Sequence, residues 1–250
     1  MSYVLQTHNL VKRFAGFVVT DDVNLNVAAG ARHALIGPNG AGKTTLINLL
    51  TGFLEPTSGS VLLRGEDVTR TSQHQRVKLG LARTFQINRL FADMTVLQSV
   101  MLATCEQRGV GARFWRPLGS HGEALDDAAA LLAQLRLLDV SHLQTRHLAY
   151  GKQRLVEIAL ALAARPSVLL LDEPAAGVPT DESRELLETI AQLPRDVSIV
   201  LIEHDMDLVF RFADRISVLV GGAILAEDVP EAIAADPRVQ EVYLGEASHG

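Results

Sequence analysis

The segment from Gly37 to Thr44, GPNGAGKT, has the residue types and spacing of a loop that binds phosphate. It matches the pattern G-x-x-x-x-G-K-[ST], in which glycines let the backbone wrap closely around phosphate oxygens. The flanking runs ARHALI and LINLLTG predict a strand before the loop and a helix after it. Because the pattern requires this context, we interpret the segment as a nucleotide-phosphate site rather than as a flexible glycine turn.

The residues of this loop have separate expected roles. Lys43 would reach the β and γ phosphates of a nucleotide, and the Thr44 hydroxyl would ligate Mg²⁺. Thr45 would add a further phosphate contact. The expected phosphate-binding residues are Gly37, Pro38, Asn39, Gly40, Ala41, Gly42, Lys43, Thr44 and Thr45.

A second group of chemical residues ends the apolar run LLLDE, at Asp172 and Glu173. Buried strands of α/β sheets bring such residues to their carboxyl ends, where ligands bind. Asp172 would complete the Mg²⁺ shell, and Glu173 would be the general base that polarises the attacking water. An acidic pair at a strand end is common on protein surfaces, so this assignment depends on the phosphate loop.

Two further polar residues, Gln86 in RTFQ and His204 in LIEHD, stand at the edges of predicted elements. A lone Gln or His is usually structural, so residue type alone assigns neither of them to a site. Gln86 lies at the junction with a helical region, and His204 follows another predicted strand. Both become site candidates only through a resemblance to a known family, which uses residues of these types in the same order along the chain.

The elements that must position these residues follow from hydrophobic patterning. FVVTDDVNLNV and GSVLLRGEDV alternate apolar and polar residues, which predicts an antiparallel sheet in the first third of the chain. From about Phe91 to Ala164 the pattern is helical, and its leucines are expected to form core. SVLLLDE and SIVLIEHD predict buried parallel strands around a helix from about Thr180 to Gln192, and SVLVGGAIL predicts a hairpin.

Composition narrows the class of protein. The chain has 250 residues, 48% of them hydrophobic, and a net charge of -6, which argues against a broad electrostatic grip on nucleic acid. The single cysteine, Cys105, excludes an internal disulfide and is expected to fill core. The N-terminal residues lack the apolar region of a secretory signal, and no apolar run approaches the roughly 18 residues of a membrane span. We expect a soluble chain that sits on a membrane partner.

The order of phosphate loop, Gln86, the segment LAYGKQR, Asp172-Glu173 and His204 resembles that of ABC-transporter ATPase domains. The resemblance runs from LVKRF to ADPRVQEVYLGE and is closest to ATPase subunits of branched-chain amino acid importers, through RTFQ, DEPAAG, IEHDM and YLGE. It implies an α/β fold, a P-loop NTPase core with an antiparallel β subdomain and an inserted α-helical subdomain. We expect one domain, divided into core (1–87 and 166–229), helical subdomain (88–165) and tail (230–250).

The resemblance implies roles that residue patterns alone do not give. Phe14 would stack on adenine, with Phe17 as the competing candidate. Gln86 would sense Mg²⁺ and the attacking water, and His204 would hold the γ phosphate and orient that water. The segment from Arg89 to Val96 would line the cleft that receives a coupling helix of the membrane subunit.

The resemblance also implies partners. The ATPase would work as a head-to-tail pair with a second ATPase subunit, the same or related, on two permease subunits at the cytoplasmic face of the inner membrane. A solute-binding protein would deliver the solute, and ATP hydrolysis would drive import. Branched-chain amino acids lead as the solute, while other amino acids, amides, urea and aromatic acids stay open. The signature facing the partner's ATP would be Leu148, Ala149, Tyr150, Gly151 and Lys152.

Two segments depart from the family pattern. The usual signature is Leu-Ser-Gly-Gly-Gln, so Ala149 removes a serine hydroxyl, worth roughly 1.5 to 3 kcal/mol for a hydrogen bond to a charged phosphate. Lys152 adds a cation near the helix start that would favour a bound triphosphate. Val178, Pro179 and Thr180 replace the usual Leu-Asn-Pro in a loop that would cross the dimer interface. A weakened signature would make the composite site that it serves the slower one.

Competing hypotheses are a soluble ABC ATPase acting on nucleic acid or ribosomes, and a P-loop kinase. The first usually has two cassettes or a long coiled-coil insertion, and the chain shows neither. A kinase would need an acceptor pocket and a lid, whereas Glu173 and His204 favour hydrolysis. The stretch from Arg108 to Gly122, with the only tryptophan, is interpreted as a surface loop, with a contact to the membrane complex as the alternative.

Overall fold

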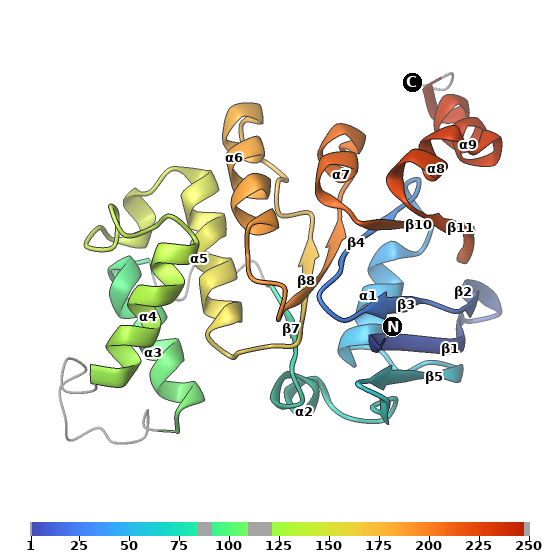
Figure 1. Ribbon diagram of the computed structural model, residues 1–250. Coiled ribbons are helices and arrows are strands. Elements are labelled where there is room, and N and C mark those ends of the chain that lie inside the picture. Colours follow the sequence, from blue (N-terminus) through green and yellow to red (C-terminus); the bar gives the residue numbers. More distant parts are fainter. Residues whose placement is uncertain (1, 85–91, 110–121, 248–250) are drawn as a thin grey trace. The chain divides into compact units, whose positions relative to one another are not determined.

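A computed structural model of the chain describes residues 2–84, 92–109 and 122–247. The chain divides into two compact units. The sheet unit comprises Met1–Leu81, Ser167–Glu173 and Pro194–Gly250, and the helical unit comprises Ala82–Pro166 and Pro174–Leu193. Segments far apart in the sequence therefore meet within each unit, as the blue and orange-red strands do in the ribbon of Figure 1.

The first layer of the sheet unit is the predicted antiparallel sheet. Its path is β2-β1-β5-β6, with β3 pairing on β1. The turn Ala15-Gly16 joins β1 to β2 with φ of 44° and 95°, the positive pair that a tight hairpin with right-handed strand twist requires. The strands are β1 (Tyr3–Phe14), β2 (Phe17–Val23), β3 (Asn26–Ala28), β5 (Ser58–Leu63) and β6 (Glu66–Asp67).

The second layer is a sheet with the order β11-β10-β4-β9-β8-β7. Strands β10, β4, β9 and β8 pair in parallel, and β11 pairs with β10 in the antiparallel hairpin that SVLVGGAIL predicted. All residues of β4 and β9 are buried, as expected for strands covered on both faces. The strands are β4 (Arg32–Ile36), β7 (Leu81–Arg83), β8 (Val168–Asp172), β9 (Ser198–Ile202), β10 (Arg215–Val220) and β11 (Ala223–Asp228).

Helices complete the core of the sheet unit on both faces of the second layer. One apolar cluster joins α1 to strands of both sheets, and another joins the opposite face of β4 and β10 to the C-terminal helices (Figure 1). Gly52 ends α1 in the left-handed conformation that is common for glycine at the end of a helix. The helices are α1 (Lys43–Thr51), α2 (Gln73–Lys78), α7 (Met206–Phe212), α8 (Pro230–Ala235) and α9 (Pro237–Ala247).

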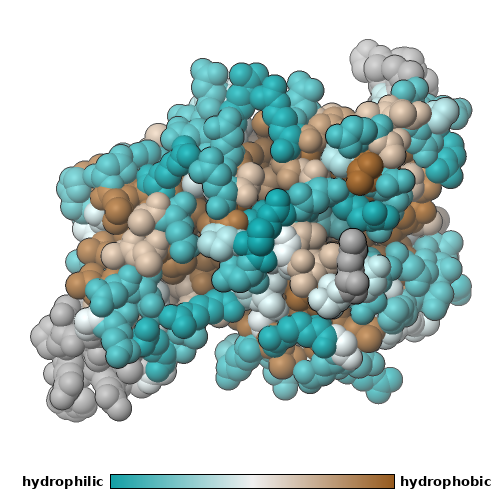
Figure 2. All heavy atoms as spheres, in the orientation of Figure 1, coloured by the Kyte–Doolittle hydropathy of each residue, from teal (hydrophilic) through white to brown (hydrophobic). Residues whose placement is uncertain are grey.

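In residues 92–109 and 122–164, the helical unit contains helices α3, α4 and α5, as the helical pattern from about Phe91 to Ala164 predicted. Its α3 begins with a capping box, in which Thr95 and Gln98 each bond the other's backbone N–H. The predicted helix at Thr180 is present as α6, whose surface in Figure 2 is largely hydrophilic. The helices are α3 (Val96–Gln107), α4 (Gly122–Gln134), the 3-10 turn η2 (Thr145–His147), α5 (Tyr150–Leu162) and α6 (Thr180–Ala191).

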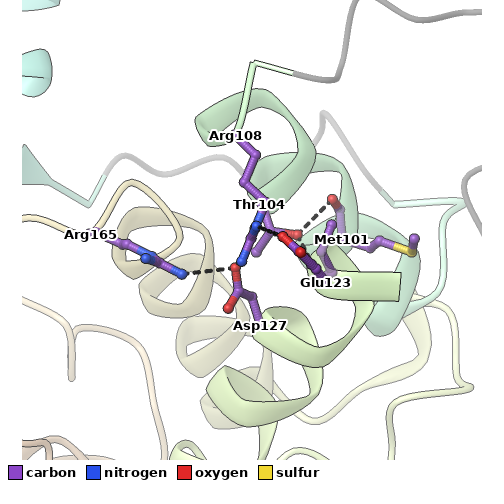
Figure 3. Close-up of polar contacts among 7 residues, drawn as sticks. Met101, Thr104, Arg108, Glu123, Asp127 and Arg165 are labelled. Atoms are coloured by element: carbon purple, nitrogen blue, oxygen red, sulfur yellow. Dashed lines mark hydrogen bonds and ion pairs between the residues drawn. The ribbon is translucent and has the colours of Figure 1, made fainter. Parts of the chain in front are cut away.

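A cluster of charged side chains ties three parts of the helical unit together (Figure 3). At the end of α3, Arg108 donates to Asp127 of α4 at 2.7 Å and also pairs with Glu123. Asp127 accepts a further bond of 2.9 Å from Arg165, which follows α5. Beside them the buried Thr104 hydroxyl donates to the Ala124 carbonyl oxygen at 3.0 Å. These contacts fix the α3 and α4 ends against each other.

Two expectations about burial and membranes can be compared with this fold. Cys105 is buried in α3, as predicted for a core residue, and burial raises the pKa of its thiol. Within residues 2–84, 92–109 and 122–247, every helix is too short or too polar to cross a bilayer.

Candidate functional site

The phosphate loop connects β4 to α1 through backbone positions that only glycine fills easily. Gly37 has φ of 152°, and a Cβ there would lie 2.1 Å from the Leu219 carbonyl oxygen. Gly42, the N-cap of α1, has φ of 100° and no side-chain capping bond. The loop therefore stays close to β10 while the start of α1 is left open to an anion, which the helix dipole favours there.

Lys43 is folded back onto this loop. Its ammonium is buried and donates to the Gly37 carbonyl oxygen at 2.6 Å and to that of Pro38 at 3.0 Å. A cation held at the mouth of the loop on a flexible stem is placed to receive phosphate oxygens. The other predicted loop residues lie around it, with Thr44, Asn39 and Gly40 exposed, Pro38, Gly42 and Thr45 half-buried, and Ala41 buried.

Parallel pairing brings the predicted chemical residues to the carboxyl edge of the same sheet. β4, which leads into the phosphate loop, pairs with β9, and β9 pairs with β8. Asp172 is the last residue of β8, and His204 follows β9 by two positions. The sheet unit thus assembles the loop, Asp172, Glu173 and His204 from three separate parts of the sequence.

Glu173 has a constrained backbone. Its φ is 48°, in the left-handed region that non-glycine residues rarely adopt, and its N–H donates to the Ile202 carbonyl oxygen at 2.9 Å. Its Oε1 lies 2.5 Å from Nε2 of His204, and both side chains are partly exposed. Strain of this kind concentrates at functional sites, and here it directs a carboxylate onto an imidazole.

Hard oxygen donors at this edge fit Mg²⁺. Thr44 offers a hydroxyl and Asp172 a carboxylate, and Mg²⁺ is usually held by one or two protein oxygens together with phosphate and water. Among the described residues there is no cluster of three or more His, Cys, Asp or Glu side chains able to hold a metal alone. The donor set therefore fits a metal that arrives with a nucleotide.

The predicted adenine platform lies at the β1–β2 turn. Phe14 and Phe17 are directly opposite each other in the hairpin, and their exposed fractions are 42% and 78%. The Lys12 ammonium lies 5.1 Å from the centroid of the Phe14 ring. The Phe14 ring and the Phe17 ring are each exposed enough to contact a base. The structure therefore does not choose between these two candidates.

Sequence inspection missed Arg76, which supports the opposite end of the phosphate-loop helix. This guanidinium, 1% exposed, donates to the carbonyl oxygens of Leu49 and Leu50 at 2.7 and 2.6 Å, and to that of Thr69 at 2.9 Å. Burial lowers the pKa of Arg76 to about 10. An arginine in a short polar segment carries no sequence signal for this role, because the three acceptors are backbone atoms.

In the helical unit the signature segment spans the start of α5, which begins at Tyr150 with Ala149 as N-cap. Arg154, one turn later, donates to the Tyr150 hydroxyl at 2.8 Å and to Glu157 at 2.9 Å, and its guanidinium lies 4.9 Å from the Tyr150 ring centroid. Burial raises the pKa of Glu157. The Tyr150 hydroxyl and ring are therefore both contacted by Arg154, a residue of the same helix.

Lys152 has an ion-pair partner within the helical unit, because its ammonium donates to the Asp139 carboxylate at 2.8 Å. The expectation that Lys152 favours a bound triphosphate stays a prediction. A second carboxylate reaches the signature itself, because the Gly151 N–H donates to Oε2 of Glu182 at 2.9 Å. Sequence inspection had assigned Glu182 no role.

Some predicted residues lie outside the described part of the chain. Gln86 is one of them, together with Arg89 and its neighbours up to position 91 in the expected coupling segment. Most of the stretch from Arg108 to Gly122 also falls outside it. The roles assigned to these residues stay predictions.

Comparison with known proteins agrees with this geometry. The family described as "ABC transporter" matches residues 20–176, and the family "Branched-chain amino acid ATP-binding cassette transporter" matches residues 223–249. The chain belongs to the ABC transporter family. Membership identifies the chain as an ATP-binding transporter subunit, in which ATP hydrolysis is coupled to transport.

Relatives match over almost the whole chain. The high-affinity branched-chain amino acid transport ATP-binding protein LivG of Escherichia coli K12 is 42% identical, covering 98% of both chains. The corresponding protein BraF of Pseudomonas aeruginosa is 40% identical with the same coverage. A crystal structure of the ADP conformation of an ABC-transporter ATP-binding cassette superposes with a TM-score of 0.85, at 31% identity over 98% of this chain and 100% of that one. The predicted fold class is confirmed.

Proposed function

We propose that this ATPase subunit energises an importer of branched-chain amino acids. The contact of Glu173 with His204 beside the phosphate loop is the observation that supports hydrolysis at this site. The solute is inferred from the relatives, whose names give branched-chain amino acid transport and which align over 98% of the chain. Their transport function also disfavours the alternative of a soluble ATPase acting on nucleic acid or ribosomes.

In the proposed reaction, Lys43 and the N–H groups at the start of α1 bind the β and γ phosphates. Oε1 of Glu173 accepts a proton from the attacking water, and Nε2 of His204 lies 2.5 Å from that oxygen in this structure. With ATP bound, His204 would instead hold the γ phosphate and orient the water. The Thr44 hydroxyl and the Asp172 carboxylate would hold Mg²⁺, which supplies charge neutralisation to the phosphates. Gln86 would sense the metal and the water.

Adenine is assigned to the hairpin turn. We expect Phe14 to stack on the base, and the Lys12 ammonium against that ring leaves one face of Phe14 for it. Phe17, the more exposed ring, remains the competing candidate. Stacking holds the base without reading its hydrogen bonds, so this contact would add affinity more than selectivity.

The signature segment is assigned to the nucleotide of a partner ATPase in a head-to-tail pair. Without a serine hydroxyl at Ala149, its remaining phosphate donors are backbone N–H groups of the first turn of α5. The composite site that uses this signature is therefore expected to be the slower of two when the partner is a different subunit. The test compares ATP turnover of the assembled pair after mutation of Glu173 with turnover after the equivalent mutation in the partner. Equal losses of turnover would contradict the expected difference between the two sites.

The remaining partners follow from the same proposal. Two permease subunits would form the translocation path, a solute-binding protein would deliver the amino acid, and the ATPase would sit on the permeases at the cytoplasmic face of the membrane. The segment from Arg89 to Val96 would contact the permease. Amides, urea, aromatic acids and other amino acids are the competing solutes.

Reconstitution tests the proposal directly. The ATPase would be co-purified with the permeases and binding protein encoded beside it and placed in vesicles loaded with ATP. Uptake of labelled leucine, isoleucine and valine is expected, and competition by urea, amides or aromatic acids identifies the solute. ATP-dependent uptake of one of those competitors with no uptake of branched-chain amino acids would overturn the assignment.

A further inference from the structure

The signature helix α5 starts without a cap of its own. Its N-cap, Ala149, has no side-chain acceptor, and its first turn carries no acidic residue. The N–H groups of a first turn have no partners within the helix and carry the positive end of its dipole. The N–H groups at the start of α5 are therefore available to an acceptor from elsewhere in the chain or to a ligand.

Glu182 supplies that acceptor from another helix. Its Oε2 lies 2.9 Å from the Gly151 nitrogen, although the two residues are 31 positions apart in the sequence. A Cβ at Gly151 would approach the same oxygen to 2.9 Å and the Glu182 Cβ to 3.2 Å. Both atoms belong to the Glu182 side chain, so this side chain lies directly against the first turn of α5.

The loop before Glu182 packs on the same turn. A Cβ at Gly151 would lie 3.5 Å from Cγ1 of Val178, and one at Gly177 would lie 3.5 Å from Cε1 of Tyr150. This is the loop whose sequence departs from the family pattern, and Pro179 leaves α6 without a side-chain N-cap. The signature and this loop thus form one contact surface within the helical unit.

We propose that Glu182 is an internal competitor for the phosphate-binding face of the signature. The inference rests on the proposed function, in which this face receives the γ phosphate of the partner's ATP. An amide N–H makes one strong hydrogen bond, so Gly151 cannot donate to a carboxylate and to a phosphate together. The two anions also repel each other at this distance.

Closing of the ATPase pair then requires the carboxylate to leave Gly151. A ligand shifts an equilibrium only by its differential affinity for the two states, so binding to Glu182 in the open state lowers the apparent affinity of the pair for ATP. After hydrolysis the same carboxylate returns to the amide and favours opening. Glu182 is a positioning residue in this scheme, since it acts through the signature amide.

The test measures the ATP concentration at which the assembled transporter closes. All variants carry Glu173→Gln, which blocks hydrolysis, and closing is followed by cross-linking the signature segment to the opposite phosphate loop. Glu182→Gln keeps the shape and removes the charge, and we expect half-maximal closing at an ATP concentration about three to ten times lower. Asp181→Asn removes a charge from the same first turn of α6, where Asp181 is exposed, and is expected to change it less than twofold.

A second measurement separates competition from simple structural support. In the nucleotide-free complex, the Gly151 amide of the Glu182→Gln variant is expected to exchange its hydrogen faster than in the parent. Equal or weaker closing in Glu182→Gln, at unchanged thermal stability, would overturn the competitor role. Failure of the parent complex to bind ATP or to close with it would instead contradict the proposed function, so the two outcomes are distinguishable.

Discussion

The two units of the molecule position their functional groups by different means. In the sheet unit, parallel strands and a backbone bond from Glu173 to Ile202 fix the proposed catalytic residues. In the helical unit, side chains such as Glu182 and Asp139 hold the signature segment. Backbone ladders resist rearrangement, whereas side-chain contacts exchange partners without unfolding a helix. The comparison indicates that one unit supplies fixed chemistry and the other supplies a surface that changes partners.

The largest expected effect tests the fixed chemistry. Glu173→Gln removes the proton acceptor beside His204 while keeping its size, so ATP hydrolysis should fall by about 10²- to 10⁴-fold with nucleotide affinity retained. Steady-state phosphate release and equilibrium binding of a fluorescent ATP analogue measure the two quantities. Turnover above about a tenth of wild type would remove Glu173 from the role of base.

Arg76→Ala asks whether the sheet unit depends on a buried side chain as well as on its backbone. The change removes the Arg76 donor from two carbonyl oxygens at the C-terminal end of α1 and from that of Thr69, and we expect a loss of about 3 kcal/mol in unfolding free energy. Urea titration measures this loss. The exposed neighbour Arg70→Ala is the control and should change stability by less than about 0.5 kcal/mol. Similar losses in both variants would contradict the capping role.

A buried histidine makes the sheet unit sensitive to acid. Nε2 of His33 on β4 lies 2.8 Å from the Ser217 hydroxyl, and this hydroxyl donates to Glu227 at 2.7 Å. Arg215 forms an ion pair with the same carboxylate. Burial lowers the pKa of His33 from 6.5 to about 4, with Glu227 opposing the shift and Arg215 adding to it. The unfolded chain therefore takes up this proton more readily than the folded one.

Stability from His33 is thus fully present above about pH 6.5 and declines as the pH falls toward 4, by up to about 3 kcal/mol. His33→Gln removes this titration and should flatten the pH dependence of the urea midpoint over that interval. His74→Gln, at an exposed position of α2, should leave the slope unchanged. An unchanged slope in His33→Gln would show that other groups dominate acid unfolding.

The smallest effect lies on the surface of the helical unit. Lys152 and Asp139 form a pair whose side chains are 32% and 64% exposed, and such pairs contribute little in water. Lys152→Ala should therefore change unfolding free energy by less than about 0.5 kcal/mol and leave the ATP dependence of closing unchanged. A marked rise in the ATP requirement would support the interpretation of Lys152 as a cation that favours bound triphosphate.

Much of the sheet unit could be predicted from the sequence because its signals are local. The pattern at Gly37–Thr44 and the apolar runs before Asp172 and His204 each specify a short element with a defined end, and parallel pairing then brings those ends together. The contacts of Arg76 could not be predicted in this way. Its acceptors are backbone carbonyl oxygens, which every residue has, so the sequence does not mark them.

The sequence by itself determined the family, the phosphate loop and the strands that deliver the acidic pair and the histidine. Only the tertiary structure decided that Lys152 pairs with Asp139 and that Glu182 bonds the Gly151 amide. The physical reason is the distance along the sequence over which each interaction acts. Local patterns encode backbone conformation over a few residues, whereas the packing of two helices brings Glu182 to an amide 31 positions away.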